Sequence, residues 1–271
     1  MRSLRPHERQ YRRAGRAGSG PRMLAEETPV ALSFNGVTQA VMMATPSDLE
    51  DFAVGFALNE GLVADASDIE QLEVVEVEDG VDLQIRVSDE IGERLAKRRR
   101  AMAGPVGCGL CGVESIAEAV KPRRAVDSDF KLAADDIARA MAELTKVQPM
   151  NAESGAVHAA GFWTPGSGLV FAREDVGRHN ALDKLAGALA RSDVDAGEGA
   201  VLLTSRVSLE MIQKTAAIGA PIVLAISAPT ALAVRTAQDA NVTLVAVVRD
   251  EDHEIFTHPR RIAHGEIADV A

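Results

Sequence analysis

Residues 200–249 read AVLLTSRVSLEMIQKTAAIGAPIVLAISAPTALAVRTAQDANVTLVAVVR and decide the fold. The apolar runs at 200–204, 221–226 and 242–249 have the length of buried strands, and the segments between them have helical spacing. A strand at 169–172 and a helix at 180–191 extend the alternation upstream. Strands and helices that alternate at this pitch predict an α/β fold, a mostly parallel sheet with helices on both faces.

Polar residues follow each of these four expected strands, and ligands of such sheets bind beyond the carboxyl ends of the strands. Arginines and hydroxyls at helix N-termini favour anions such as phosphate. The candidate binding residues are Arg178, His179, Asn180, Ser205, Arg206, Ser208, Ser227, Thr230 and Arg249. Taken singly, Ser208 and Asn180 are typical helix caps, and Asp183 with Lys184 reads as a solvated pair. The repetition at four strand ends is what predicts a site.

The N-terminal part divides into two segments. Residues 1–22 carry seven arginines, one glutamate and few large apolar residues, which predicts a disordered basic tail. In residues 23–90, apolar runs on both sides of Asn35-Gly36 and Asp79-Gly80 predict two hairpins in a small α+β lobe. Between the hairpins, Thr45 is the expected N-cap of a helix, with Ser47 to Glu50 as an alternative capping box.

The only two cysteines, Cys108 and Cys111, lie in the sequence GCGLCG at 107–112. Glycine adapts to many backbone conformations, so we expect residues 91–112 to form a flexible basic loop that can present a sulfur atom. The cations at 97–100 and a helix expected at 113–120 favour the thiolate, the reactive form. We therefore interpret the pair as an accessible thiolate that carries a group.

Other uses of a CxxC pair fit less well. Structural zinc needs four ligands, and the chain has no second CxxC. A thioredoxin-like dithiol follows a strand and carries a flanking aromatic residue, and a zinc deaminase places HxE before its cysteines; neither pattern is present. A disulfide across so short a loop contributes little. No metal site is predicted.

Composition excludes several classes of function. The net charge is −11 and aromatic residues make up 3% of the chain, which argues against a nucleic-acid or membrane surface. No apolar run has the length of a membrane span and no export signal is recognised, so we expect a cytoplasmic protein. With 46% hydrophobic residues, the chain can bury a substantial core.

Several motifs together resemble the formate dehydrogenase accessory sulfurtransferases. They are the cysteine motif at 107–112, EDVGRHNALDK at 174–184, SRVSLEM at 205–211 and SAPT at 227–230. The resemblance covers about residues 29–261. It implies a three-layer α/β/α sandwich similar to the cytidine deaminase fold, with residues 113–271 as the cofactor-binding domain, and a homodimer.

The resemblance also implies a function. Proteins of this kind take persulfide sulfur from a cysteine desulfurase and deliver it to the molybdenum or tungsten bis(guanine dinucleotide) cofactor that formate dehydrogenase requires. Here Cys108 would carry the persulfide and Cys111 would assist. A guanine nucleotide would mimic the cofactor. The family's contact in the last strand falls on Val247, Val248, Arg249, Asp250, Glu251 and Asp252.

Two other functions remain open from the residues. A thiol–disulfide oxidoreductase would use Cys108 and Cys111 equally and need no sulfur donor. A non-catalytic chaperone would hold the cofactor and leave the cysteines as ligands or spectators. Sulfur gained on Cys108 after incubation with a desulfurase separates the carrier from both.

Overall fold

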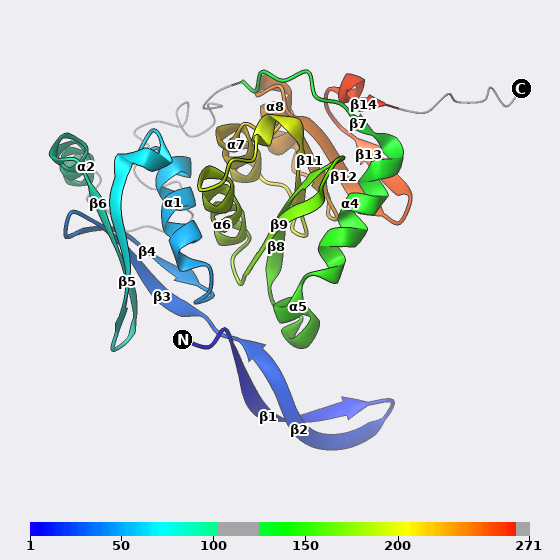
Figure 1. Cartoon of the computed structure of the whole chain (residues 1–271). Helices are drawn as coiled ribbons and strands as arrows, with labels where there is room; N and C mark the ends of the chain where they lie inside the picture. The colour runs from blue at the N-terminus through cyan, green and yellow to red at the C-terminus, as the bar shows by residue number, and fades with distance from the viewer. Residues whose placement is uncertain (102–124, 264–271) are drawn as a thin grey trace, which may run out of the picture.

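The computed structural model describes residues 1–101 and 125–263, which form two lobes and a projecting arm (Figure 1). In the N-terminal lobe, the sheet order is β4-β3-β6-β5. Its strands are β3 (Thr28–Phe34), β4 (Val37–Ala44), β5 (Ile69–Val77) and β6 (Gly80–Val87). Both predicted hairpins are confirmed. Asn35 and Gly36 have φ of 47° and 79°, the left-handed pair that a two-residue hairpin turn requires.

One face of this sheet packs against α1 (Leu49–Asn59) and α2 (Asp89–Ala101). The core joins Leu32 and Leu83 of the sheet to Phe52 of α1 and Leu95 of α2. Residues 91–101 are therefore helical rather than part of a loop, and the lobe extends past residue 90. The predicted cap of α1 is also wrong, because the N-cap is Asp48 and neither Thr45 nor Ser47 caps the helix.

Residues 1–22 are not a disordered tail. They belong to an antiparallel hairpin of β1 (Leu4–Arg13) and β2 (Arg16–Ala25), which projects from the body as an arm (Figure 1). Its turn explains why a polar segment folds locally. Ala14 and Gly15 have φ of 46° and 80°, and two successive left-handed residues match the twist of the strands they join.

The main sheet has six strands in the order β13-β12-β11-β10-β8-β9. They are β8 (His158–Thr164), β9 (Gly168–Asp175), β10 (Ala200–Leu203), β11 (Ile222–Ala225), β12 (Thr243–Arg249) and β13 (Asp252–Ile255). Only β10–β11 and β11–β12 pair in parallel, so the prediction of a mostly parallel sheet is wrong. Because β8 is antiparallel to both β9 and β10, the strands β9 to β12 nevertheless share one direction.

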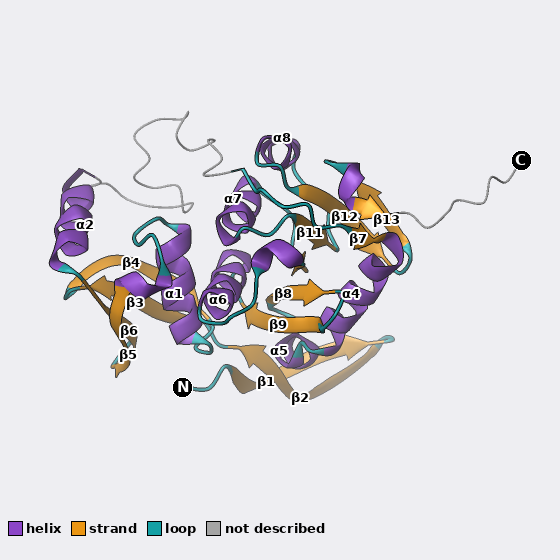
Figure 2. Ribbon diagram, turned by 45° about the horizontal axis from the view of Figure 1, so that its top comes forward, coloured by secondary structure: helices purple, strands orange, loops and turns teal. Residues whose placement is uncertain are grey.

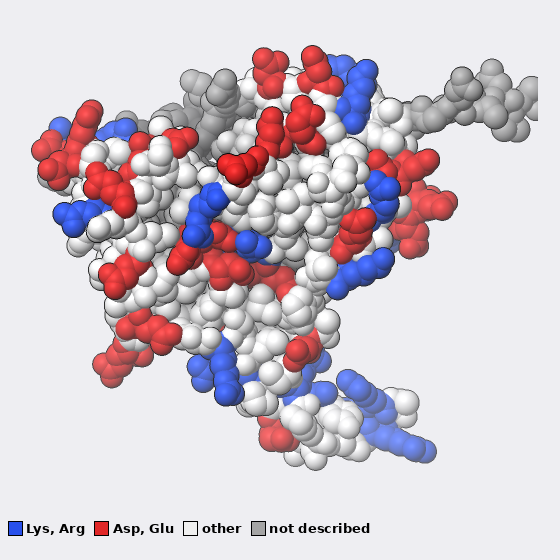
Figure 3. Space-filling view, viewed as in Figure 1, with Lys and Arg blue, Asp and Glu red and all other residues white. Residues whose placement is uncertain are grey.

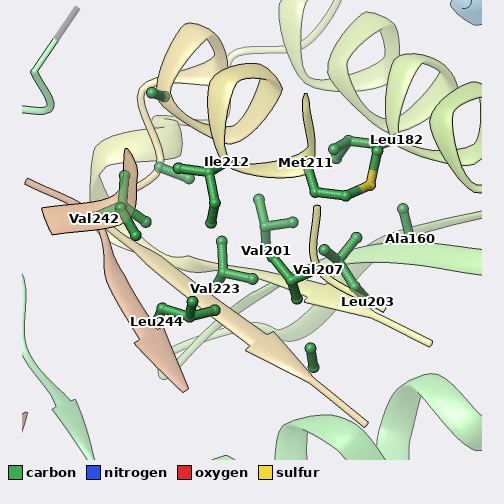
Figure 4. Close-up of a cluster of buried hydrophobic side chains, with 14 of the residues drawn as sticks. Ala160, Leu182, Val201, Leu203, Val207, Met211, Ile212, Val223, Val242 and Leu244 are labelled. Carbon is green, nitrogen blue, oxygen red and sulfur yellow. The ribbon is translucent and has the colours of Figure 1, made fainter. Parts of the chain in front are cut away.

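Helices cover both faces of the main sheet, as predicted (Figure 2). On one face lie α6 (Arg178–Ala190), α7 (Leu209–Ile218) and α8 (Ala231–Asp239), and on the other α4 (Ala134–Lys146). Strand alternation divides the core between them. Val201 and Leu203 of β10 pack under Leu182 and Met211 (Figure 4), whereas Leu202 packs against α4. The protein is thus an α/β sandwich with a smaller α+β lobe.

Short elements complete the chain. Helix α5 (Pro149–Ser154) precedes β8, and β7 (Leu132–Ala133) pairs with β14 (Ile262–Ala263). Single 3₁₀ turns occur at Ala66–Asp68, Ala196–Glu198 and Pro259–Arg261. Among the described residues, no helix is long and apolar enough to cross a membrane.

The two lobes meet where α1 crosses α6. A Cβ added at Gly55 would lie 1.7 Å from the carbonyl oxygen of Asp183, and one added at Gly187 would lie 1.9 Å from that of Asp51. Only glycine allows the two helix backbones to approach so closely. At the edge of this contact, Asp51 accepts hydrogen bonds from Arg173 and Arg191 of the other lobe, at 2.9 and 2.7 Å.

Candidate functional site

The four co-directional strands bring their carboxyl ends to one edge of the main sheet, as the sequence predicts. We call the loops 176–180, 204–208 and 227–230 and the turn 249–252 the strand-end rim. Two of its loops touch directly. The N–H of Thr230 donates to the carbonyl of Val207 at 3.0 Å, and Val207 forms an isolated parallel bridge with Pro229.

Asp175 organises the first part of the rim. The last residue of β9, it is fully buried, and its carboxylate accepts hydrogen bonds from the backbone N–H of Gly177 (2.8 Å) and from Asn180 Nδ2 (3.0 Å). It also accepts from the backbone N–H of Thr45 in the other lobe at 2.9 Å. These bonds fix the start of α6, and therefore the two residues that α6 presents first, Arg178 and His179.

The pair Asp183 and Lys184 is buried, which corrects the prediction of a solvated pair. Lys184 Nζ lies 2.7 Å from the Asp175 carboxylate and donates to the Thr45 carbonyl at 2.9 Å. Burial lowers the pKa of Lys184, and the Asp175 carboxylate opposes that shift. Asp183 accepts from Lys214 Nζ at 2.6 Å and from Asn59 at 2.6 Å. Both ion pairs therefore support the lobe interface next to the rim.

Three partly buried basic side chains lie next to this support, and we call them the cationic cluster. It consists of Arg178 and His179 from α6 and His158 from the first position of β8, which pairs in register with Asp175. Burial and the charge of Arg178 lower the pKa of His158. Arg178 Nε and His179 Nε2 are buried and have no hydrogen-bond partner. Arg178 supplies the fixed positive charge of the cluster, and its Nε is an unused donor position, which suits an anionic ligand.

Glu210 balances this cluster. Its carboxylate lies 3.5 Å from His179 Nε2, beyond good hydrogen-bond geometry, and accepts a hydrogen bond from the Ser208 hydroxyl at 2.7 Å. The adjacent His179 and the Ser208 hydroxyl lower the pKa of Glu210 to about 2, although burial acts in the opposite direction. Glu210 is therefore a fixed negative charge that orients the His179 ring.

Some predicted site residues support the rim from within. Asn180 is buried, and its amide also donates to the Met43 carbonyl at 2.8 Å. The Ser205 hydroxyl is buried and donates to the carbonyl of Arg206 at 3.1 Å, while Arg206 itself is exposed. Thr230 caps α8 by accepting from the N–H of Ala233 at 3.1 Å. Ser227 is half-buried at the end of β11.

The turn after β12 lies at the other end of the rim. Four strand spacings separate β9 from β12, a distance of about 19 Å. A bulge reorients the backbone there, since Val247 and Asp250 have φ of 56° and 51° and the register with β13 shifts between Ala246 and Arg249. Exposed at this turn are Arg249, Asp250, Glu251 and Asp252; Val248 is buried on the α4 side and Val247 is half-buried.

Cys108, Cys111 and the helix expected at 113–120 lie outside the described residues. Within residues 1–101 and 125–263, no group of three His, Cys, Asp or Glu side chains is placed to hold a metal ion. The candidate site is therefore built from the rim alone.

Sequence reasoning missed three functional or supporting residues, His158, Glu210 and Lys214. The sequence places His158 at the start of an expected strand, which would be the wrong end in a parallel sheet. Because β8 is antiparallel to β9 and β10, its first residue lies beside the carboxyl ends of those strands, at the rim. Glu210 stands in the first turn of α7, where an acidic residue is common for helix stability alone.

The FdhD/NarQ family model matches residues 25–263. A sulfur carrier protein FdhD from Agrobacterium fabrum is 53% identical, over 92% of this chain and 93% of that protein. One from Cupriavidus necator is 49% identical, over 93% and 88%. A crystal structure assigned to a formate dehydrogenase accessory protein from Desulfotalea psychrophila has a TM-score of 0.77 and 26% identity, over 97% of this chain and all of that one. The resemblance of the motifs is confirmed, and the chain belongs to the FdhD/NarQ family.

Proposed function

We propose that this protein is a sulfur carrier that serves the maturation of formate dehydrogenase. The names of its relatives support this role, because proteins about 50% identical over most of the chain are called sulfur carriers. The cationic cluster supports it independently. Arg178 Nε is buried without a hydrogen-bond partner, and His179 lies beside it on the rim, so the rim offers an anionic ligand a donor that is still free.

The sulfur is carried by Cys108, and Cys111 assists. In the loading step, the Cys108 thiolate attacks the terminal sulfur of a persulfide on a cysteine desulfurase. A new S–S bond forms at Cys108, the donor's S–S bond breaks, and the donor cysteine leaves as a thiolate. On delivery, the recipient supplies an electron pair to the outer sulfur, the S–S bond at Cys108 breaks, and Cys108 leaves as the thiolate.

The recipient is the molybdenum or tungsten bis(guanine dinucleotide) cofactor, bound as a substrate along the strand-end rim. Its phosphates suit the guanidinium and imidazole donors of the cationic cluster, and the rim length of about 19 Å suits a ligand with two dinucleotide arms. Arg206 and Arg249 provide exposed positive charge farther along the rim. Glu210 lies 3.5 Å from His179 Nε2 and restricts the orientation of the imidazole ring.

Guanosine diphosphate tests the site without requiring the metal. By calorimetry, we expect it to bind the wild type and to bind at least about tenfold more weakly to Arg178→Ala, because one charge-assisted contact is worth about 1.5–3 kcal/mol. Arg235→Ala removes an exposed arginine in the middle of α8 and serves as the matched control. Equal affinity of the two variants, or no binding to the wild type, would contradict the cofactor site.

Cells that lack the protein test the sulfur-carrying role. We expect Cys108→Ser to abolish formate dehydrogenase activity at normal protein levels and Cys111→Ser to reduce it. Equal loss in both variants would favour a thiol–disulfide oxidoreductase, and full activity in both would favour a cofactor-holding chaperone. We also propose that the protein acts in the cytoplasm and as a homodimer.

A further inference from the structure

The arm formed by β1 and β2 has two chemically different faces. Pairing in register places Arg5, Arg9, Tyr11 and Arg13 of β1 and Arg16 and Arg22 of β2 on one face, because alternate residues of a strand point the same way. The opposite face carries Pro6, Gln10 and Ala17 with only one arginine, Arg12. We call the first the basic face of the arm.

Contacts with the Tyr11 ring order two arginine side chains of the basic face. The Tyr11 ring lies 4.7 Å below the guanidinium of Arg9 and 5.3 Å from that of Arg13, so stacking orders both cations. The ring covers Gly18, where an added Cβ would lie 2.8 Å from it. Arg9 Nε is buried and has no hydrogen-bond partner.

Among the described residues, hydrogen bonds and ion pairs anchor the base of the arm to its own chain. Arg22 donates to the Ser154 carbonyl of α5 at 2.6 Å, Arg5 pairs with Glu26, and the Met1 ammonium lies 2.9 Å from Glu76. The outer end projects away from both lobes (Figure 1). A two-stranded hairpin is marginally stable in water by itself, so a long exposed one gains from a surface that covers it.

Charge indicates what that surface is. Residues 1–25 carry seven arginines and one glutamate, whereas the rest of the chain holds 39 of the 40 acidic residues and 22 of the 29 basic ones. The arm is therefore formally +6 and the body −17. Figure 3 shows the separation, with basic residues on the arm and acidic ones over the N-terminal lobe. So acidic a body disfavours a nucleic acid or an anionic membrane as the partner.

The N-terminal lobe offers an acidic sheet edge that suits the arm. Strand β5 is that edge, and it exposes Glu76 and Val74 on one face and Glu73 and Val77 on the other. Glu76 already accepts a cation from the N-terminal segment, the Met1 ammonium of its own chain. Since every copy carries both a basic arm and an acidic body, two copies are complementary to each other in the way a symmetric dimer requires.

We propose that the arm docks through its basic face on the acidic body of a second copy of this chain, so that two copies exchange arms. This assigns the arm as the segment that builds the homodimer. The assignment does not depend on sulfur transfer, and its test has a readout separate from formate dehydrogenase activity.

Adjacent arginines on opposite faces provide a matched pair of variants. Arg13→Glu and Arg12→Glu make the same change of charge at neighbouring exposed positions, but only Arg13 lies on the basic face. In analytical ultracentrifugation, we expect the wild type to have twice the chain mass of 28.7 kDa and Arg13→Glu to raise the dimer dissociation constant about tenfold. Arg12→Glu should change it far less. A monomeric wild type, or equal effects of the two variants, would overturn the proposal.

Photo-crosslinking identifies the surface that the arm meets. We would replace Tyr11 with p-benzoylphenylalanine in an equal mixture of ¹⁴N- and ¹⁵N-labelled full-length chains and map the crosslinks by mass spectrometry. Mixed-isotope crosslinks from position 11 to the acidic body are the expected result. Crosslinks only within one chain, or only between two arms, would contradict arm exchange.

Discussion

At the scale of single residues, the candidate site depends on the buried carboxylate of Asp175, which supports the rim without contacting a ligand itself. Asp175 receives donors from both lobes, and Lys184 neutralises it at 2.7 Å. Neither side chain is exposed to solvent. Burying two charges is costly, and the cost is offset only while both are present and hydrogen-bonded. We infer that Lys184 and Asp175 position Arg178 and His179 at the start of α6.

Removing one member of this pair should therefore destabilise the fold. We expect Lys184→Met to lower the free energy of unfolding by about 3–5 kcal/mol, because Asp175 remains buried without its counter-charge. Urea denaturation followed by circular dichroism measures it. Lys146→Met, an exposed lysine in the last turn of α4, is the control and should cost under about 1 kcal/mol. Similar small losses in both variants would show that the pair contributes little.

The low pKa of Glu210 predicts a pH dependence. Because its pKa is about 2 in the folded protein and about 4.5 ordinarily, its contribution is complete above pH 4.5 and is lost as the pH falls toward 2. Glu210 is partly exposed, so we expect about 1 kcal/mol after solvent screening. The difference in unfolding free energy between wild type and Glu210→Gln should shrink across that window.

The exposed Glu93→Gln in α2 provides the comparison for this measurement. A difference between wild type and Glu210→Gln that stays constant from pH 5 to pH 2 would mean that His179 and Ser208 do not stabilise the Glu210 carboxylate.

The sequence predicts residues of the rim better than the residues that support it. Arg206 and Arg249 are exposed at strand ends, where a polar residue beside an apolar run is easily recognised. Lys184 is the opposite case. Charged residues are rarely buried, Thr45 is 139 residues away in the chain, and Asp175 lies on the preceding strand rather than one helical turn away, so no helical or strand periodicity could reveal the pair.

At the scale of elements, the crossing of α1 and α6 fixes how the lobes meet. The helix backbones touch at Gly55 and Gly187, and the same crossing places Asn59 against Asp183 at 2.6 Å. The rim begins at the N-terminus of α6, so any shift of α6 relative to α1 displaces Arg178 and His179. The crossing therefore couples the N-terminal lobe to the candidate site.

Gly55→Ala tests this coupling. The added methyl group meets the backbone of α6, which cannot rotate away, so we expect a loss of about 3 kcal/mol of stability despite alanine's better helix propensity. Gly166→Ala adds the same group where no atom lies within 4 Å and should be close to neutral. Thermal unfolding of both variants measures the difference. A stable Gly55→Ala would show that the helices are free to separate.

Element types follow from the sequence more readily than their pairing. The predicted runs at 200–204, 221–226 and 242–249 correspond to β10, β11 and β12, because apolar runs between helices are strong local signals. The insertion of β8 between β9 and β10 is a long-range pairing that periodicity does not encode. The arm was missed for a related reason: its turn, rather than a hydrophobic pattern, makes it a hairpin.

At the scale of the whole molecule, the chain combines an acidic body with two local concentrations of positive charge. One is the cationic cluster at the rim, and the other is the basic arm. Such separation lets a protein of net charge −11 bind an anion without attracting nucleic acid in general. The rim provides the proposed recipient site, and the arm provides the proposed contact with a second copy.

The proposed function depends on sulfur carried by Cys108. Its most direct test is intact and peptide mass spectrometry of the wild type and of Cys108→Ser after incubation with a cysteine desulfurase and cysteine. We expect one additional sulfur atom, about 32 Da, on Cys108 of the wild type, removable by dithiothreitol, and none on Cys108→Ser. An unmodified Cys108 in the wild type, or equal sulfur gain in the variant, would contradict it.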